Sequence, residues 1–447
     1  MISVFTMSKS KDDKNPITPF AITDYRDIKK RFGIKEKNRR GHMYIIGKTG
    51  TGKTTLIENM IISDIKAGNG LAVIDPHGDL AEHLLNFIPK RRIKETIYFN
   101  PSDLDYPIAF NPLEKVDRDH HHLVASGLIS VLKKIWHEFW GPRMEHILRN
   151  AILALLDYSD STLLDIPLVL VDKDFRKKVL ERVANPQVKD FWFSEFERYS
   201  AYFRSEAISP IQNKVGQFIV SPLIRNIVGQ TQSSMDFRKI IDEGKILIVN
   251  LSKGKIGEDN CSLLGAMIVT KIQLAALSRG DVPEFKRRPF YLYVDEIHNF
   301  LTLSFADILS EARKYGLYLI LTHQYIEQLD EEIRSAVFGN VGTLVTFRVG
   351  ARDAQFLKNE FSPVFDETDL VNLSNYHSYL KLMINGVTSK PFSAQTLPPP
   401  EIKTSHKDKV VEESRNRFAG RREEVEREIT ERRVLEGKPP FRQMRIF

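Results

Sequence analysis

The residues best suited to chemistry lie in the stretch Gly47–Thr54, which reads GKTGTGKT. An apolar run over 43–46 precedes it and a helix-like pattern over 55–62 follows, so we expect a strand, a glycine-rich loop and a helix. The glycines let the backbone wrap around phosphate groups with its N–H groups pointing inward, and the helix N-terminus adds partial positive charge. The stretch therefore predicts a site for a nucleoside triphosphate.

Each residue of this phosphate loop has an expected part. Lys53 would neutralise the β- and γ-phosphates, and the Thr54 hydroxyl would bind Mg²⁺. The nucleotide-binding residues are predicted to be Gly47, Lys48, Thr49, Gly50, Thr51, Gly52, Lys53, Thr54 and Thr55. The implied ligands are ATP and Mg²⁺.

A second group of chemical interest follows the apolar run 290–294, which ends in Asp295 and Glu296. A strand ending there would place Asp295 beside the phosphate loop, where its carboxylate can hold the magnesium shell. Glu296 is the natural candidate to polarise an attacking water. A small-molecule kinase does not need such a glutamate, so the pair favours hydrolysis over transfer of phosphate to a metabolite.

Two further strand ends carry polar residues. The apolar run 318–323 ends at Gln324, which we expect close to Asp295 and able to hydrogen-bond the γ-phosphate or the water. The run 71–74 ends at Asp75, where ligands bind in open α/β sheets. Asp75 would support the magnesium shell or the loop, or would only cap a turn.

An arginine is expected to stabilise charge on the transferred phosphoryl group from across a subunit boundary. Arg313, 18 residues past Asp295, is one candidate, although by itself it fits a surface arginine better. Arg348 and Arg352, in a strand-to-helix passage, are its rivals.

The elements that position these residues alternate between apolar strands and helices, which predicts an α/β core with a mostly parallel sheet. Apolar residues with helical spacing dominate the middle of the chain and predict an all-α insertion. The expected divisions are a basic N-terminal arm (1–40), the first part of the core (41–115), the insertion (116–238), the second part of the core (239–397) and a charged C-terminal tail (398–447).

Composition narrows the class of protein. The chain has 447 residues, a formal charge of +7 and one cysteine, Cys261, which excludes an internal disulfide framework. We expect no membrane-spanning helix, because no apolar run approaches the ~20 residues that one needs. The basic balance permits a polyanionic partner without requiring one.

The ordered series GKTGTGKTTL, AVIDPHGDL, YLYVDEIHNF and ARKYGLYLILTHQ resembles the FtsK–HerA superfamily of P-loop ATPases, and within it the conjugative coupling proteins of type IV secretion. The resemblance spans residues 41–395. It implies a RecA-like core with a helical insertion, a hexameric ring, and ATP-driven pumping of DNA. It also implies that Lys53 and Thr54 match the Walker A residues, Asp295 and Glu296 the Walker B pair, Gln324 the polar sensor and Arg313 the arginine acting in trans.

The expected function is thus a DNA-translocating ATPase with Lys53, Glu296, Gln324 and Arg313 as its catalytic residues. Two alternatives stay open: an ATPase that moves or assembles protein, and an ATP-binding scaffold that does not pump. Coupling proteins usually carry N-terminal transmembrane helices, and none is evident in this sequence. We therefore expect a cytoplasmic protein, either soluble or recruited to the inner face of the membrane by a secretion partner.

Overall fold

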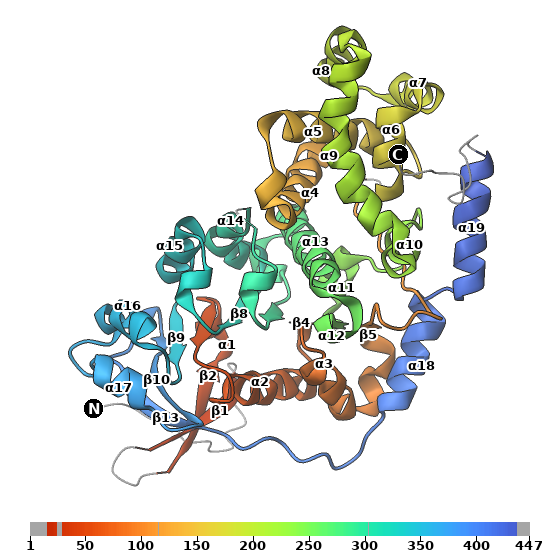
Figure 1. Cartoon of the computed structure of the whole chain (residues 1–447). Coiled ribbons are helices and arrows are strands. Elements are labelled where there is room, and N and C mark those ends of the chain that lie inside the picture. Colours follow the sequence, from red (N-terminus) through yellow and green to blue (C-terminus); the bar gives the residue numbers. More distant parts are fainter. Residues whose placement is uncertain (1–15, 25–28, 115, 303, 436–447) are drawn as a thin grey trace. The chain divides into compact units, whose positions relative to one another are not determined.

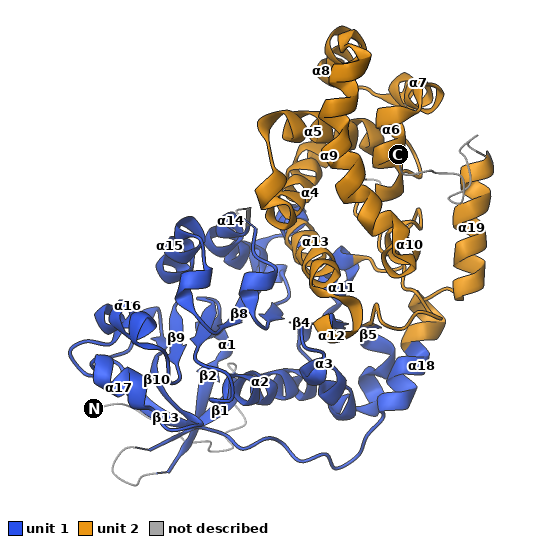
Figure 2. Cartoon of the chain, viewed as in Figure 1, with its two compact units in different colours: residues 1–98, 237–252, 275–413 blue, residues 99–236, 253–274, 414–447 orange. Residues whose placement is uncertain are grey.

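The structure is a computed structural model that describes residues 16–24, 29–114, 116–302 and 304–435 (Figure 1). The chain divides into two compact units, drawn in different colours in Figure 2. Unit 1 comprises residues 1–98, 237–252 and 275–413, and unit 2 comprises residues 99–236, 253–274 and 414–447.

Within the described residues, one 11-stranded sheet has the order β2-β1-β13-β10-β9-β3-β8-β7-β4-β6-β5. The six strands from β9 to β6 pair in parallel. Those from β2 to β9 pair antiparallel. The expected α/β fold with a mostly parallel sheet is confirmed. The strands are β1 (Ile17–Thr23), β2 (Arg31–Lys35), β3 (Met43–Ile46), β4 (Gly70–Asp75), β5 (Thr96–Phe99), β6 (Ile246–Asn250), β7 (Phe290–Val294), β8 (Leu317–His323), β9 (Thr343–Thr346), β10 (His377–Lys381) and β13 (Phe392–Thr396), beside a small hairpin of β11 (Met383–Ile384) and β12 (Val387–Thr388).

The parallel strands bring the polar strand ends together. Strands β3, β4, β7 and β8 are buried at every residue, as apolar runs covered on both faces must be. Ile46 at the end of β3 pairs with His323 at the end of β8, and Val294 at the end of β7 pairs with Leu321. The segments that follow these three strands therefore leave the sheet along one edge.

The helices of unit 1 cover this sheet, and the apolar residues of the helix after the phosphate loop lie in its core cluster. They are α1 (Glu36–Arg39), α2 (Lys53–Ala67), α3 (Asp79–Leu84), α11 (Phe237–Glu243), α14 (Ser304–Glu311), α15 (Glu331–Asn340), α16 (Ala351–Phe361) and α17 (Glu367–Asn372).

The expected N-terminal arm needs a correction. Residues 1–15 lie outside the described residues, but 17–23 and 31–35 form β1 and β2. Strand β1 pairs with β13, with Ala21 opposite Thr396, and Phe20 is fully buried. Strand β13 is thus more than 370 residues away from β1 in the sequence, and no local sequence pattern could reveal that the two strands pair.

Unit 2 is helical. Its helices are α4 (His121–Ile135), α5 (Pro142–Asp157), α6 (Ile166–Val171), α7 (Lys173–Arg182), α8 (Pro186–Asp190), α9 (Ala201–Val220), α10 (Pro222–Val228), α12 (Lys253–Ile256), most of α13 (Glu258–Leu277) and α19 (Arg422–Leu435). The unit holds more than the predicted insertion, because it also includes residues 253–274 and 414–447. Leu263 and Met267 of α13 line an apolar cavity together with Trp136 of the expected insertion.

Helix α13 bears on the expectation about membrane spans. Among the described residues, the helical stretch Glu258–Asp281 is long and apolar enough to cross a membrane by length and composition alone. Of its most apolar window, 61% is buried inside the protein, as in a core helix. A scan for unbroken apolar runs misses it because polar residues such as Thr270 and Lys271 interrupt the run.

The C-terminal region is ordered into helices as far as the described residues extend. Helix α18 (Lys407–Phe418) and α19 follow the three prolines at 398–400. Val410 of α18 is fully buried in the core cluster of unit 1. The first part of the expected charged tail thus includes a helix that packs on unit 1 through Val410, although most of its residues are exposed or half-buried.

Candidate functional site

The phosphate loop joins β3 to α2 and curls around the Lys53 amine. Gly50 and Gly52 adopt left-handed backbone conformations, with φ of +74° and +117°, which glycine reaches without steric penalty. The Lys53 Nζ donates hydrogen bonds to the carbonyl oxygens of Gly47 at 2.6 Å and Lys48 at 3.2 Å. The amine thus lies inside the loop, where a phosphate chain needs its charge.

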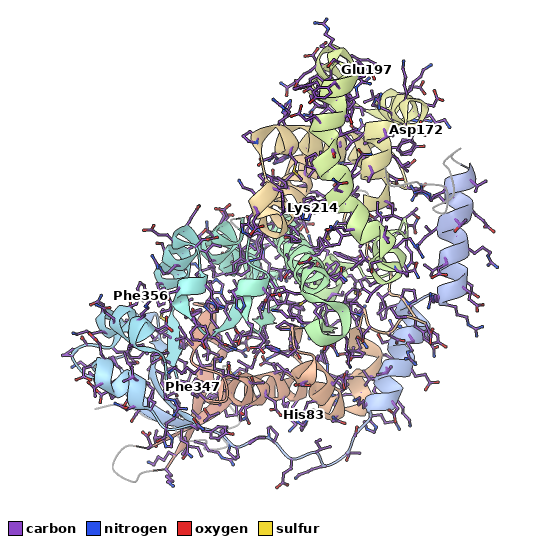
Figure 3. The ribbon with its side chains drawn as sticks, in the orientation of Figure 1. His83, Asp172, Glu197, Lys214, Phe347 and Phe356 are labelled. Atoms are coloured by element: carbon purple, nitrogen blue, oxygen red, sulfur yellow. The ribbon has the colours of Figure 1, made fainter. Side chains whose placement is uncertain are left out.

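The floor of the loop is Phe347, which follows β9 and is fully buried; Figure 3 labels it. A side chain built on Gly47 would meet the Phe347 Cβ at 2.5 Å. The Thr51 hydroxyl donates to the Lys48 carbonyl at 2.7 Å and closes the turn from within. The first glycine is therefore required by close packing rather than by its backbone angles.

The two acids lie next to this amine. The Glu296 Oε1 is 4.0 Å from the Lys53 Nζ, and both side chains are about 6% exposed. The Thr322 hydroxyl of β8 donates to the Asp295 carboxylate and accepts from the Glu296 backbone N–H at 3.2 Å. One hydroxyl therefore fixes both acids at the sheet edge that carries the loop.

Glu296 has an unusual backbone conformation, and its carboxyl has a raised pKa. Its φ of +47° is unusual for a residue other than glycine, and such angles persist only where the surroundings enforce them. Burial raises the pKa of the Glu296 carboxyl, and the Asp295 charge adds to the rise, whereas Lys53 and Gln324 oppose it. A raised pKa makes the carboxylate a stronger base for a water proton.

Gln324 lies where its strand end predicts. Its Nε2 donates to the Glu296 Oε1 at 2.9 Å. The other oxygen, Oε2, is buried and accepts no hydrogen bond from the described residues. The amide thus holds one oxygen of Glu296, and the second lies 3.6 Å from the His298 Nδ1.

Both carboxylate oxygens of Asp75 bind the backbone of the turn that follows β4. Its Oδ1 accepts from the His77 N–H at 2.8 Å and its Oδ2 from the Ala81 N–H at 2.9 Å. Both oxygens are therefore used to cap the turn into α3.

The three candidate arginines lie at different places relative to the phosphate loop. Arg313 is exposed in a short 3-10 helix (Ala312–Tyr315) before β8, whereas Gln324 follows that strand. A strand of this length spans about 20 Å, so Arg313 cannot reach the site of its own chain. Arg348 lies beside the phosphate loop, since its carbonyl accepts from the Lys48 N–H at 2.9 Å. Arg352 forms an exposed ion pair with Glu327 at 3.2 Å.

The donor set fits Mg²⁺. Thr54, exposed in the first turn of α2, offers a hydroxyl, and Asp295 a carboxylate; both are the oxygen ligands that this ion prefers. Across the described ranges, no group of three or more His, Cys, Asp or Glu side chains gathers as a metal cage. A magnesium ion of the nucleotide kind needs only one or two protein ligands, because phosphates and waters complete its shell.

Sequence reasoning missed Thr322 and Phe347. Thr322 is a polar residue inside an otherwise apolar strand, two positions before Gln324 and thus on the same face. That alternation was the available signal. Phe347 offered none, because its part depends on the backbone of a loop 300 residues earlier.

The family described as the type IV secretion-system coupling protein DNA-binding domain matches residues 31–379. The chain belongs to this family. The resemblance to the FtsK–HerA superfamily and its conjugative coupling proteins is thereby confirmed. No curated protein matches the sequence.

Solved structures of coupling proteins share the fold. The bacterial conjugative coupling protein TrwBdeltaN70, in an unbound monoclinic form, superposes with a TM-score of 0.59 at 16% identity, over 89% of this chain and 92% of that one. TrwB in complex with ADP and Mg²⁺ gives 0.55 at 17% identity, over 84% and 89%. VirB4 of Thermoanaerobacter pseudethanolicus gives 0.54 at 14% identity, over 87% and 98%. At these identities the likeness shows the RecA-like fold and no more.

Proposed function

We propose that this chain is an ATP-hydrolysing motor of the conjugative coupling type, which forms a ring, a hexamer by family resemblance, and moves DNA. One observation carries the proposal: the phosphate-loop amine of Lys53 lies 4.0 Å from the buried carboxylate of Glu296. A phosphate-binding cation and a base for water thus share one site. Solved relatives named TrwB hold ADP with Mg²⁺ or a non-hydrolysable ATP analogue, which supports ATP as the nucleotide.

Hydrolysis follows from the positions of the side chains. Lys53 binds the β- and γ-phosphate oxygens, and Glu296 orients a water against the γ-phosphorus. The water oxygen bonds to phosphorus, its proton passes to the Glu296 carboxylate, and the bond to the β–γ bridging oxygen breaks to release ADP and phosphate. Gln324, bonded to Glu296, responds to the loss of the γ-phosphate. Mg²⁺ held by Thr54 and Asp295 would supply charge neutralisation on the phosphates.

Arg313 completes the site in trans. It is exposed at the sheet edge opposite its own phosphate loop, so it is available to a neighbouring copy. A guanidinium offered there stabilises the charge that develops on the γ-phosphoryl group. Catalysis then requires the ring.

DNA is the proposed cargo because the family description names DNA binding. The formal charge of +7 is compatible with a polyanion. The proposed location is the cytoplasmic side of the membrane, with a secretion-system protein as partner.

The direct test measures steady-state ATP hydrolysis with and without single- and double-stranded DNA, beside the mass of the oligomer. The motor account expects hydrolysis that DNA stimulates and that added salt weakens, because phosphate contacts release counterions. Turnover that DNA leaves unchanged but a protein substrate stimulates would favour the protein-moving alternative. Nucleotide binding without turnover would favour the alternative of an ATP-binding scaffold that does not pump.

A mixing experiment tests Arg313. Neither Lys53→Ala nor Arg313→Ala alone is expected to hydrolyse ATP. Mixed rings contain sites in which an intact Lys53 faces an intact Arg313 of the next copy, so mixing should restore part of the activity. Arg313→Ala rings that hydrolyse at the parent rate would exclude this arginine, and Arg348→Ala would be tested next.

A further inference from the structure

The segment between α17 and β10 touches the phosphate loop through Tyr376. The Tyr376 N–H donates to the Thr51 carbonyl at 2.7 Å, and its own carbonyl accepts from the Thr396 N–H at 2.8 Å. The residue is therefore held between the loop and the neighbouring strand β13.

Tyr376 takes an unusual conformation to do this. Its φ is +66°, a left-handed angle that is a genuine outlier for a bulky side chain. Glycine would adopt the same angle without strain. A tyrosine in this place keeps its backbone strained and presents an aromatic ring to the loop, and such outliers gather where a ligand is held.

The Tyr376 ring touches the phosphate loop and remains partly open to solvent. The Tyr376 Cδ1 is 3.0 Å from the position where a side chain on Gly52 would begin, just before Lys53. The residue is nevertheless 47% exposed. Part of the ring thus packs on the loop, and the exposed part is available for a contact with a ligand.

Strand order indicates what that contact would be. Asp295, Glu296 and Gln324 follow β7 and β8, which lie on one side of β3. Tyr376 precedes β10, which lies on the other side beyond β9. Because the γ-phosphate must face Glu296, the ribose and base extend away from the acids and toward the side of Tyr376.

Arg348 fixes this arrangement. Its guanidinium donates to the Leu373 carbonyl at 3.2 Å and to the Asn375 Oδ1 at 2.9 Å, while its carbonyl accepts from the Lys48 N–H. The turn before Tyr376 is thereby tied to the phosphate loop at a second point. The ring is preorganised, which lowers the entropy lost when a ligand packs on it.

We propose that Tyr376 forms the stacking surface for the nucleotide base. The inference rests on the proposed function, that the phosphate loop binds ATP. Every base has a π-face, so stacking on tyrosine contributes affinity without strong selection among bases. The triphosphate contacts of Lys53 are separate from this surface, so the two can be tested apart.

The test compares the dissociation constants of ATP and inorganic tripolyphosphate for the parent, Tyr376→Phe and Tyr376→Asn. Asparagine tolerates left-handed angles, so Tyr376→Asn removes the ring while keeping the backbone. We expect Tyr376→Phe to bind both ligands like the parent. Tyr376→Asn should bind ATP at least about tenfold more weakly and tripolyphosphate unchanged. Tyr202→Asn, an 82% exposed tyrosine in unit 2, is the matched control and should change neither.

Two results would overturn the inference while leaving the proposed function intact. One is that Tyr376→Asn binds ATP with parent affinity while Lys53→Ala no longer binds it. The other is an equal loss for ATP and tripolyphosphate, which would assign Tyr376 to the loop backbone alone. If the parent binds neither ligand, the proposed function itself fails, and the base surface with it.

Discussion

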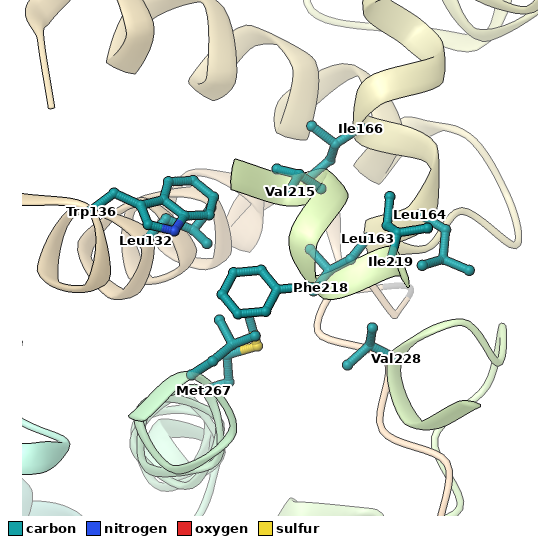
Figure 4. Close-up of a pocket in the computed structure, with 11 residues that line it drawn as sticks. Leu132, Trp136, Leu163, Leu164, Ile166, Val215, Phe218, Ile219, Val228 and Met267 are labelled. Carbon is teal, nitrogen blue, oxygen red and sulfur yellow. The ribbon is translucent and has the colours of Figure 1, made fainter. Parts of the chain in front are cut away.

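The sheet edge of unit 1 and the interior of unit 2 use burial in opposite ways. At the sheet edge, Asp295 and Glu296 are each 5% exposed and share the Thr322 hydroxyl. The interior of unit 2 holds a cavity of about 20 Å³ lined by apolar and aromatic side chains, among them Trp136, Phe218 and Met267 (Figure 4). At the sheet edge, burial holds the polar side chains of the site in fixed positions. In unit 2, burial packs apolar side chains into a hydrophobic core. Substitutions should therefore change turnover in the first region and folding stability in the second.

Lys53→Ala should have the largest effect of these changes, and it tests whether the sheet edge controls ATP turnover. The change removes the charge that neutralises the phosphates, and we expect ATP turnover to fall at least about a thousandfold. Steady-state phosphate release measures it. Lys66→Ala, at an exposed position near the end of the same helix α2, is the control and should turn over like the parent.

Arg39→Met tests whether unit 1 also depends on polar burial for folding. The Arg39 guanidinium donates to both Asp64 oxygens at 2.7 and 2.8 Å and to the Tyr293 hydroxyl, tying α1 to α2 and β7. Removing one partner leaves Asp64 buried without its counter-charge, which should lower the unfolding free energy by about 3–5 kcal/mol. Urea unfolding measures this, and a second change, Asp64→Leu, should recover part of the loss. A loss below about 1 kcal/mol would mean that this pair is not needed for stability.

Leu148→Ala is the counterpart in unit 2. Leu148 of α5 is fully buried, and removing its side chain leaves a cavity, so the unfolding free energy should drop by about 3 kcal/mol. The KM for ATP should not move, because no site residue comes from this unit. A raised KM at unchanged stability would break the contrast between the two regions.

Thr322→Val should have the smallest effect, and it tests whether a polar contact at the sheet edge affects turnover without affecting stability. Valine keeps the shape but loses the hydroxyl that holds Asp295 and Glu296, so kcat should fall about tenfold. The melting temperature should stay within a few degrees of the parent. An unchanged kcat would show that the two acids are positioned without this contact.

The sequence predicts best where the needed pattern is local. The phosphate loop and the strands ending at Asp295 and Gln324 follow from apolar runs and glycine spacing, and parallel pairing brings them to one edge. Residues whose part depends on distant partners were not predictable. Strand β1 needs β13, Phe347 needs Gly47, and Tyr376 needs the Thr51 carbonyl and a backbone angle that its residue type disfavours.

The central claim is that Lys53 and Glu296 act on one triphosphate, and Glu296→Gln tests it most directly. Glutamine keeps the shape but cannot accept the water proton, so the variant should bind ATP with parent affinity and hydrolyse it at least about a hundredfold more slowly. Turnover at the parent rate would contradict the account, because the base would then lie elsewhere.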